Sequence, residues 1–412
     1  MSNPYSYELY QSIDDVNAEE WRDICRRSGN VYLDPRFLKG VEVAFAADAQ
    51  FWYAIYRDEA GTAVAATCFS RYLIDCALMA PPVVQRLAAT VRTFWRRFLK
   101  YKVLLCGIPV STCDSQLAIA DEADPARVVA GLSDAAMQIA RQARCRLISF
   151  KEFSPELAAR INGLTDHGFL KPRSVYAYHL EGNFESFNNY LASRPKRTRA
   201  KIRKSLRSFE DAGLTCEQLR GRDAAHLLTP EFHQFYLNVL DRAKVRFERL
   251  PEEFFPQMAR QLPDESCFTI ARQGDKIIGF CFGIAGADQH VMLFVGRDYD
   301  VTPEADLYFN LIYRGLDQGL TSGVRAVHIG ASSDEFKQQI GCRGSWLSVY
   351  VKAVKPLSQI LLKQVFGLLF DTRDGTNAPP PAGLVKVEAR ETTLNPNTQN
   401  PQQTMPSAVA SS

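Results

Sequence analysis

Hydrophobic positions in the first half of the chain recur with strand or helix spacing and predict a succession of elements. Two short helical patterns within residues 1–50 precede an aromatic strand at residues 51–57, and a DEAG turn leads into a second strand. Helical spacing returns in PVVQRLAATVRTFWRRFLK, and KVLLCGIPVS is a buried strand. Asp124 as a cap and Pro125 in the first turn begin a long helix, after which CRLISFKEF is another buried strand.

The second half repeats this order of elements. A strand over residues 175–180 and a short helix lead to a long helix with Pro195 in its first turn and Gly213 just past its end. Two more helices precede a meander of three short strands, CFTIAR, IIGFCFGIAG and HVMLFVG. A helix, a buried strand and a short helix then occupy residues 306–344, and SWLSVYVKAVK is a final strand. A hairpin, a long helix and a buried strand thus occur in the same order twice, which indicates an internal duplication.

These patterns predict an α/β (α+β) fold with two domains, each a mixed central sheet flanked by helices. A chain of 412 residues is too long for one ordinary core, which also favours two domains. We place the domains at residues 1–182 and 183–371. The apolar helix PLSQILLKQVFGLLF is expected to pack on the body, with contact to a membrane surface as the alternative. Residues 372–412 are rich in Pro, Asn, Gln, Thr and Ser and are predicted to be a disordered tail.

Composition narrows the class of protein. The first residues are polar and acidic rather than a signal peptide, and no apolar run approaches the roughly 20 residues of a membrane-spanning helix. The ten cysteines form no CxxC pair and no metal-ligand spacing with histidine. We therefore expect reduced thiols, no metal site and a cytoplasmic location.

Positive charge is concentrated in one helix, although the net charge of the chain is only +3. Eight basic residues lie from Arg194 to Arg207, and no acidic residue lies between Glu185 and Glu210. Such a helix, at residues 194–212, suits a tRNA backbone, the phosphopantetheine face of an acyl-carrier protein or an acidic substrate, and a solvated amphipathic helix is the structural alternative. The basic residues predicted to bind substrate here are Arg194, Lys196, Arg197, Arg199 and Arg203.

Four segments within residues 165–353 resemble the Fem-type acyltransferases of the GNAT superfamily, and still more the bacterial predicted N-acyltransferases. They are a GF turn with the strand and arginine-rich helix after it, the stretch FYLNVLDRAKVRFERLPEEFF, the meander with GDKIIGFCFGI, and LYFNLIYRGLDQGLTSGVRAVHIGASSDEFKQQIGCRG. Fem-type enzymes add amino acids to peptidoglycan precursors. The resemblance implies two GNAT-like domains, the first degenerate, with a substrate cleft between them and transfer of an acyl group to an amine.

One segment departs from the acetyl-CoA-dependent members of this superfamily. Those members bind the pyrophosphate with a glycine-rich loop at a helix N-terminus, where free backbone amides attract phosphate. The corresponding stretch here, VGRDYDVTPEADLYFN, has no second glycine and carries four carboxylates, at Asp298, Asp300, Glu304 and Asp306. We expect no tightly bound cofactor. The donor is expected as a co-substrate: acyl-CoA, acyl-carrier protein or aminoacyl-tRNA, with ordinary acetyl-CoA disfavoured.

Three residues are predicted to be catalytic. Lys337 matches the family lysine and would stabilise an oxyanion or bind a donor phosphate, the alternative being a solvated helix lysine. His328, on the buried strand, would act as a general base or fill the core. Asp306 would accept a proton from the attacking amine or only cap its helix.

Three further residues are predicted to bind substrate. Tyr308 lies in the first turn of the helix that follows Asp306, where a core position is the alternative. Arg242 and Arg246 lie where the resemblance places acidic substrate groups, with a solvated loop as the alternative.

The sequence therefore predicts a bacterial N-acyltransferase. It would move an acyl or aminoacyl group from a thioester or ester donor to an amino group of a small metabolite or cell-envelope precursor. Positioning and charge stabilisation suffice for such direct aminolysis. The alternative is a non-catalytic module that binds RNA or a carrier protein and retains the GNAT fold.

Overall fold

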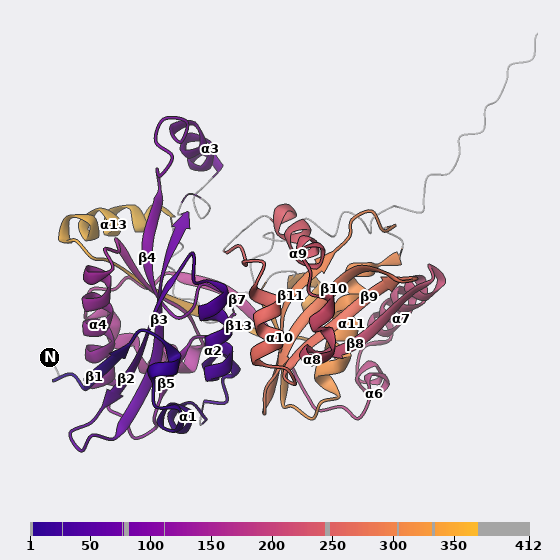
Figure 1. Ribbon diagram of the computed structural model, residues 1–412, viewed down its shortest axis with the longest axis horizontal. Coiled ribbons are helices and arrows are strands. Elements are labelled where there is room, and N and C mark those ends of the chain that lie inside the picture. Colours follow the sequence, from indigo (N-terminus) through magenta and orange to yellow (C-terminus); the bar gives the residue numbers. More distant parts are fainter. Residues whose placement is uncertain are drawn as a thin grey trace, which may run out of the picture.

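In the computed structural model, residues 3–369 are described except for 27, 76, 78–81, 111, 244–247, 303–304 and 332–333. The predicted tail at residues 372–412 lies outside this range. One mixed sheet of 13 strands runs through the molecule, in the order β1-β2-β3-β4-β6-β13-β7-β12-β11-β10-β9-β8, with β5 paired to β3 (Figure 1).

The strands of the first half are β1 (Ser6–Tyr10), β2 (Gln50–Arg57), β3 (Ala63–Asp75), β4 (Lys100–Cys106), β5 (Leu117–Ile119), β6 (Leu147–Phe153) and β7 (Arg173–Glu181). Those of the second half are β8 (Leu214–Arg220), β9 (Ser266–Gln273), β10 (Lys276–Ala285), β11 (Gln289–Arg297), β12 (Ala326–Ala331) and β13 (Arg343–Ala353).

The helices of the first half are α1 (Ala18–Arg26), α2 (Pro35–Ala44), α3 (Pro82–Val91), α4 (Pro125–Gln142) and α5 (Pro155–Arg160). Those of the second half are α6 (Phe187–Ala192), α7 (Lys196–Asp211), α8 (Gly221–Ala224), α9 (Pro230–Arg242), α10 (Phe254–Gln261), α11 (Leu307–Leu320), α12 (Asp334–Gln339) and α13 (Pro356–Leu369).

A cap followed by proline starts several of these helices. At α4 the Asp124 carboxylate accepts the N–H of Ala126, and Pro125 occupies the first turn, as predicted. The side chain at Asp34 does the same for α2 and that at Thr229 for α9. The capping side chain accepts a hydrogen bond from a backbone N–H that has no partner within the helix, and proline has no N–H that requires one. The local sequence therefore determines where these helices begin.

The predicted duplication is visible in the topology. In the first half β2, β3 and β4 form an antiparallel meander, α4 follows, and β6 returns parallel to β4. In the second half β9, β10 and β11 form the meander, α11 follows, and β12 returns parallel to β11. The sequence patterns missed the outer strands β1 and β8. Both are edge strands with few buried positions, so neither has the alternation that marks a half-buried strand.

The two halves exchange a strand at the middle of the sheet. The strand that follows β6 in the chain is β7, which pairs with β12 of the second half. The strand that follows β12 is β13, which pairs with β6 of the first half. The exchanged strands β7 and β13 also pair with each other, so the two predicted sheets are one. The predicted domain boundary at residue 182 therefore divides the chain but does not divide the sheet. A strand from each side of this boundary pairs with strands of the other half.

Helices cover this sheet in separate packing layers. The helix α4 packs on the first half over one core, and α11 packs with α6 and α7 on the second half over another. A third core joins the halves, where Phe45 meets Phe254 with ring centroids 6.4 Å apart. In that core Gly40 of α2 faces Met258 of α10, and a side chain at Gly40 would collide with the methionine.

Two helices present apolar side chains to solvent. The last helix, α13, lies against the first half rather than the second (Figure 1). Its Leu357 side chain is 82% exposed, so the prediction that this helix buries its apolar side chains is wrong for the residues described. The helix α3 projects from the first half and is shorter than its sequence pattern predicts. Within the described residues, no helix has both the length and the apolar character needed to cross a membrane.

Candidate active site

The strands β11 and β12 separate toward their carboxyl ends. They pair only from Gln289 to Val291 on β11 and from Ala326 to His328 on β12. Beyond His328, a register shift at Ile329 precedes Gly330 and Ala331, which pair with β7. Parallel strands that diverge in this way leave unpaired backbone groups at a sheet end, which is where ligands bind in many α/β folds.

Lys337 is bound to the end of β12. Its side chain is buried, and Nζ donates to the carbonyl oxygens of Ile329 at 2.7 Å, Gly330 at 3.1 Å and Ala331 at 2.9 Å. Three carbonyls can converge on one ammonium because Gly330 has φ +70°, a conformation that favours glycine. Nζ also lies 5.5 Å from the centroid of the Tyr178 ring. Lys337 is thus a buried charge, not a solvated helix lysine.

Asp306 and Tyr308 lie at the end of α11 that packs against the Lys337 helix. Phe336, next to Lys337, has its ring centroid 4.9 Å from that of Phe309 and 5.8 Å from that of Tyr313. The backbone of Asp306 has φ 51°, and its side chain forms no capping hydrogen bond, so the simple capping role does not hold. Burial and the Asp306 charge raise the pKa of Tyr313. The Tyr308 ring is half-buried and packs on Phe309.

The basic helix α7 contacts the same short helix α12. Lys201 Nζ donates to Gln339 Oε1 at 3.1 Å, and the Thr198 hydroxyl donates to the Gln339 carbonyl at 3.4 Å. Residues about 140 positions apart in sequence therefore meet. The buried stripe of α7 contains Ser205, whose carbonyl accepts a hydrogen bond from Asn310 of α11.

The five predicted basic residues divide into two groups. Lys196, Arg197 and Arg203 are exposed and form no ion pair or hydrogen bond within the described residues. Arg199 instead donates to the backbone carbonyls of Ala192 and Arg194, and the Arg194 guanidinium lies 5.4 Å from the Tyr190 ring. Lys196, Arg197 and Arg203 are therefore available to a ligand, whereas Arg194 and Arg199 partly stabilise the start of α7.

His328 is a poor proton acceptor in this environment. Burial, followed by the charges of His179 and Arg325, lowers its pKa from 6.5 to about 4. The His179 ring, on the paired strand β7, lies 5.8 Å away. His328 is thus neutral at pH 7, as a buried core histidine would be.

A pair of arginines flanks Tyr299 just past the end of β11. The Arg242 guanidinium lies 3.4 Å from the ring centroid of Tyr299 and that of Arg297 lies 4.3 Å from it. Arg297 is 7% exposed, and its Nε has no hydrogen-bond partner among the described residues. Arg246 lies outside the described residues. The sequence patterns missed Arg297 and Tyr299, although both stand where a strand ends.

The first half contributes a buried loop next to Lys337. The Glu152 carboxylate accepts the backbone N–H groups of Thr112 at 3.0 Å and Cys113 at 3.1 Å. Burial and Glu152 raise the pKa of Cys113 to about 12, opposed by Lys337 and by an N–H of Ala331. This loop from the first half therefore reaches the end of β12, and sequence patterns gave no signal for it.

Asp114 in this loop has an altered acidity. Burial raises its pKa from 3.8 to about 7, the N–H of Ser115 opposes this effect, and the charge of Glu152 adds to it. A carboxyl group that titrates near neutral pH at a junction of two halves is a candidate proton acceptor.

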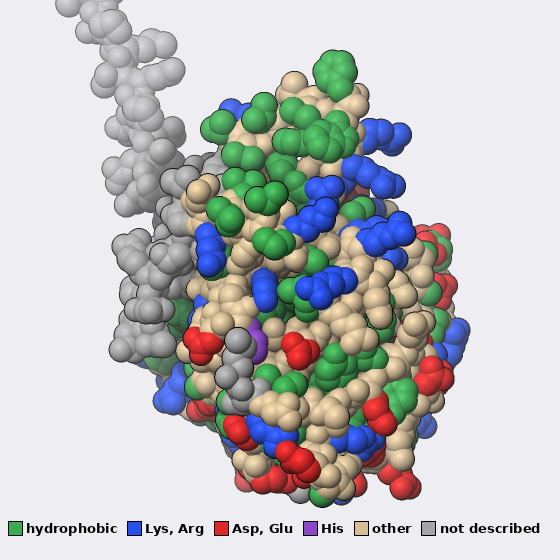
Figure 2. Space-filling model, turned by 90° about the vertical axis from the view of Figure 1, so that its left-hand side faces the viewer, with side chains coloured by type: hydrophobic (Ala, Val, Ile, Leu, Met, Phe, Trp, Pro, Cys, Tyr) green, Lys and Arg blue, Asp and Glu red, His purple; other side chains and the backbone are tan. Residues whose placement is uncertain are grey.

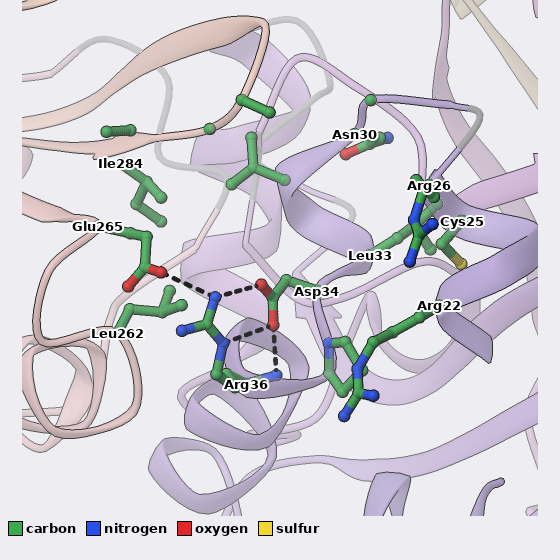
Figure 3. A pocket seen from close by; sticks show the side chains of 16 residues that line it. Arg22, Cys25, Arg26, Asn30, Leu33, Asp34, Arg36, Leu262, Glu265 and Ile284 are labelled. Carbon is green, nitrogen blue, oxygen red and sulfur yellow. Dashed lines mark hydrogen bonds and ion pairs between the residues drawn. The ribbon is translucent and has the colours of Figure 1, made fainter. Parts of the chain in front are cut away.

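A cavity of about 670 Å³ lies between the two halves (Figure 3). At its floor Arg36 pairs with Asp34 at 2.8 Å and, across the junction, with Glu265 at 2.9 Å. Asn30 in the cavity wall donates to the carbonyl of Ser115 at 2.6 Å, which connects the cavity to the Asp114 loop. Within the described residues, no cluster of His, Cys, Asp or Glu is suited to hold a metal ion.

Two meander–helix–strand repeats joined in one sheet, with parallel strands that diverge in the second repeat, define a two-repeat α/β protein with the GNAT-like fold expected from the sequence. The chain belongs to the FemAB-like family, described as peptidoglycan biosynthesis/recognition, which it matches over residues 12–361. The predicted Fem-like, acyltransferase and two-repeat α/β character is thereby confirmed.

Solved structures share this fold at low sequence identity. FemX covers 87% of this chain and 99% of its own, with a TM-score of 0.54 and 10% identity. A conserved protein of unknown function from Bacteroides thetaiotaomicron covers 85% of this chain and 100% of its own, with a TM-score of 0.51 and 11% identity. These likenesses concern the fold.

A curated relative is similar in sequence. It is a Mycobacterium tuberculosis protein named "Putative 8-amino-7-oxononanoate synthase 2", 22% identical over 302 residues. The match covers 72% of this chain but only 39% of that protein, so the chain spans about two fifths of the relative's length.

We predict that acid destabilises the protein partly through His328. Because its pKa is about 4 when folded and 6.5 otherwise, the unfolded chain binds more protons between these values. The free energy of unfolding therefore falls as pH falls from 6.5 to 4, by up to about 1.4 kcal/mol per pH unit from this residue. Urea unfolding at several pH values should show a shallower dependence for His328→Gln. The exposed His226→Gln is the control, and equal slopes in all three proteins would refute the assignment.

Proposed function

We propose that the chain transfers an acyl or aminoacyl group from an ester or thioester donor to an amino group of a small metabolite or cell-envelope precursor. The observation that carries this proposal is the contact of the basic helix α7 with α12, whose Lys337 holds the carboxyl end of β12. A polyanionic donor carrier on α7 would thus have its acyl group near the end of the diverging strands. The family description, peptidoglycan biosynthesis/recognition, supports an envelope precursor as acceptor.

The proposed reaction is direct aminolysis. The amine nitrogen forms a bond to the acyl carbon, the ester C–O or thioester C–S bond breaks, and the carrier leaves with its oxygen or sulfur. The proton lost by the amine passes to Asp114, whose raised pKa suits a base at neutral pH, and from there to the oxygen or sulfur of the leaving carrier. In this proposal Asp114 takes the role first expected of His328, because the pKa of His328 is about 4.

In this scheme Lys337 positions the strand end. Its ammonium hydrogens are directed to three backbone carbonyls, so in this arrangement it does not donate directly to an oxyanion. Its positive charge still lies in a buried region, where charge acts over longer distances than in water. Asp306 and Tyr308, at the start of α11, and the Arg242–Arg297 pair are assigned to the binding of acceptor and donor groups.

The occupied ammonium of Lys337 also supports a second candidate, a non-catalytic module that binds RNA or a carrier protein. In that case α7 would still bind a polyanion, but no acyl transfer would follow. Binding and turnover must therefore be measured separately.

We predict that donor binding depends on the outer face of α7. Lys196 and Arg203 are seven residues apart and share the face opposite the buried stripe. Lys196→Glu with Arg203→Glu should weaken binding of mixed aminoacyl-tRNA or holo-acyl-carrier protein at least tenfold. The slope of log affinity against log salt should decrease by about 0.7–0.9 for each phosphate that the helix no longer neutralises. Titrations at several salt concentrations measure both effects.

The control for this experiment is Arg141→Glu, at an exposed helical arginine of the first half. It should bind as the wild type does. Binding that is insensitive to salt and to the α7 substitutions would exclude a polyanionic donor on this helix. Binding that depends on α7 without any acyl transfer to amines would favour the non-catalytic module.

We predict that Lys337→Met lowers the free energy of unfolding by about 2–3 kcal/mol, because it leaves buried carbonyls of β12 without a donor. Urea unfolding measures this loss. Turnover of the folded fraction should fall at least tenfold, equivalent to about 1.4 kcal/mol in the activation free energy. Full stability together with lost turnover would instead favour direct contact with the reacting carbonyl, and unchanged turnover would remove Lys337 from the mechanism.

We predict that Asp114 sets the pH dependence of the reaction. A base with a pKa of about 7 makes kcat/KM rise with pH through neutrality, since only the ionised form accepts a proton. Asp114→Asn should lower kcat/KM at least about 100-fold and abolish the rise. The exposed Asp121→Asn is the matched control. A variant at Asp114 that keeps the rise would show that another group is the base.

A further inference from the structure

Large apolar side chains are exposed almost exclusively at one end of the first half. Among the described residues, only Val43 of the exposed large hydrophobic residues lies elsewhere. The others belong to α3 with the turn that follows it, to the adjoining end of β3, and to α13. Single exposed apolar residues are ordinary, but such a concentration marks an interaction surface. We name as the docking face the exposed apolar residues of α3 with its following turn and of α13. They are Val83, Leu87, Phe94, Trp95, Leu357, Ile360 and Leu361.

The first part of the docking face is a projecting arm, residues 82–99. Its Phe94 side chain is 94% exposed and its Trp95 side chain 59% exposed. The arm is held at its base, where Arg92 donates to the Asp75 carboxylate at 2.6 Å and to the Phe98 carbonyl at 3.0 Å. Ala88 is fully buried, so α3 has an inner side as well. A tethered arm that keeps its aromatic side chains in water implies a partner that covers them.

The second part is α13, which directs apolar side chains to solvent and is anchored to the protein through a polar side chain. Gln359 faces the body: its amide donates to the Gly168 carbonyl at 2.7 Å, and its oxygen accepts the N–H of Ala353 at 2.7 Å. Leu357, Ile360 and Leu361, on the other side, are more than half exposed. An ordinary surface helix shows the reverse arrangement. The apolar side of α13, over the residues described, is therefore available to a partner surface.

Basic residues predominate in the segments that carry the docking face. No acidic residue occurs between Asp75 and Asp114, whereas six basic residues do, and residues 355–370 carry Lys355 and Lys363 and no acid. Arg86, Arg96 and Arg97 are exposed beside the apolar side chains. Figure 2 shows apolar side chains gathered on the projecting top and on the face below it, with Lys and Arg side chains alongside.

We propose that this docking face binds the surface of an anionic lipid bilayer. The headgroup layer of such a bilayer is negative and the layer beneath it is apolar. Apolar and aromatic side chains on a projection, surrounded by basic residues, match both layers. Tryptophan in particular is favoured at this interface because its ring is apolar and its N–H is polar. A partner protein would need a deep apolar groove lined with acids to fit the same convex arm. The proposal is independent of the transferase function.

The experiment uses the full chain and vesicles of phosphatidylcholine with or without 30% phosphatidylglycerol. We expect at least tenfold tighter binding to the anionic vesicles in flotation, weakened by salt. Trp21 and Trp52 are buried, Trp346 is half-buried on β13 and Trp95 is 59% exposed, so a blue shift of tryptophan fluorescence on binding that Trp95→Phe removes is assigned to Trp95. Phe94→Ser with Trp95→Ser, and separately Leu357→Ser with Leu361→Ser, should each weaken binding at least tenfold. Arg96→Glu with Arg97→Glu should remove the preference for anionic vesicles.

Val43→Ser, at the exposed apolar residue outside the docking face, is the matched control and should bind vesicles as the wild type does. Circular dichroism and urea unfolding establish that each variant is folded. Equal binding by the docking-face variants and the control would overturn the proposal, as would equal binding to neutral and anionic vesicles. Self-association in sedimentation equilibrium that the same variants abolish, without vesicle binding, would show that the face joins two copies of the chain instead.

Discussion

The pairing of β7 with β13 is the interaction on which the rest of the structure depends. The two strands are exchanged between the repeats, and their ladder joins β1-β2-β3-β4-β6 and β12-β11-β10-β9-β8, five strands on each side, into one sheet. The ladder is tight: a Cβ atom at Gly344 would lie 2.5 Å from the Ala177 carbonyl oxygen. The Tyr176 ring covers Gly344, and its hydroxyl donates to the Gly344 carbonyl at 2.8 Å. Glycine on one strand and an aromatic side chain on the other thus let the backbones approach.

This exchange explains why the candidate site is built from both repeats. It brings the carboxyl ends of β6 and β12 toward the centre of the sheet, each with a residue of positive φ, Glu152 at 63° and Gly330 at 70°. At one end, Glu152 gathers the N–H groups of the loop that carries Cys113. At the other, Lys337 gathers carbonyls. The Glu152 carboxylate accepts hydrogen bonds from backbone N–H groups, and the Lys337 ammonium donates to backbone carbonyls. Because each charge has backbone partners, both can be buried near the junction.

Sequence patterns predicted the features that depend on neighbouring residues and missed those that depend on contacts between distant parts of the chain. Helix starts such as Asp124–Pro125 and the buried strands follow from neighbouring residues, so they were predictable, as was the order of the two repeats. The exchange of β7 and β13 was not, because an apolar strand carries no sign of which half it will join. The same limit applies to the site. Lys337 was found through its motif, but its burial depends on β12, and Asp114 and Glu152 come from the other repeat without any motif.

The same reasoning accounts for α13, which sequence periodicity assigned to packing. The sequence pattern of an apolar stripe is the same whether the stripe faces a core or solvent. The contacts made by the opposite side of the helix distinguish these two arrangements. Here Gln359 is the anchor, and it binds Gly168 and Ala353 because β13 has carried the chain back to the first repeat. The strand exchange therefore places the last helix on the first half of the molecule, which also carries α3, although some 270 residues separate the two helices. Within the described residues the first repeat has no basic helix like α7, and its exposed apolar side chains distinguish its surface from that of the repeat that carries Lys337.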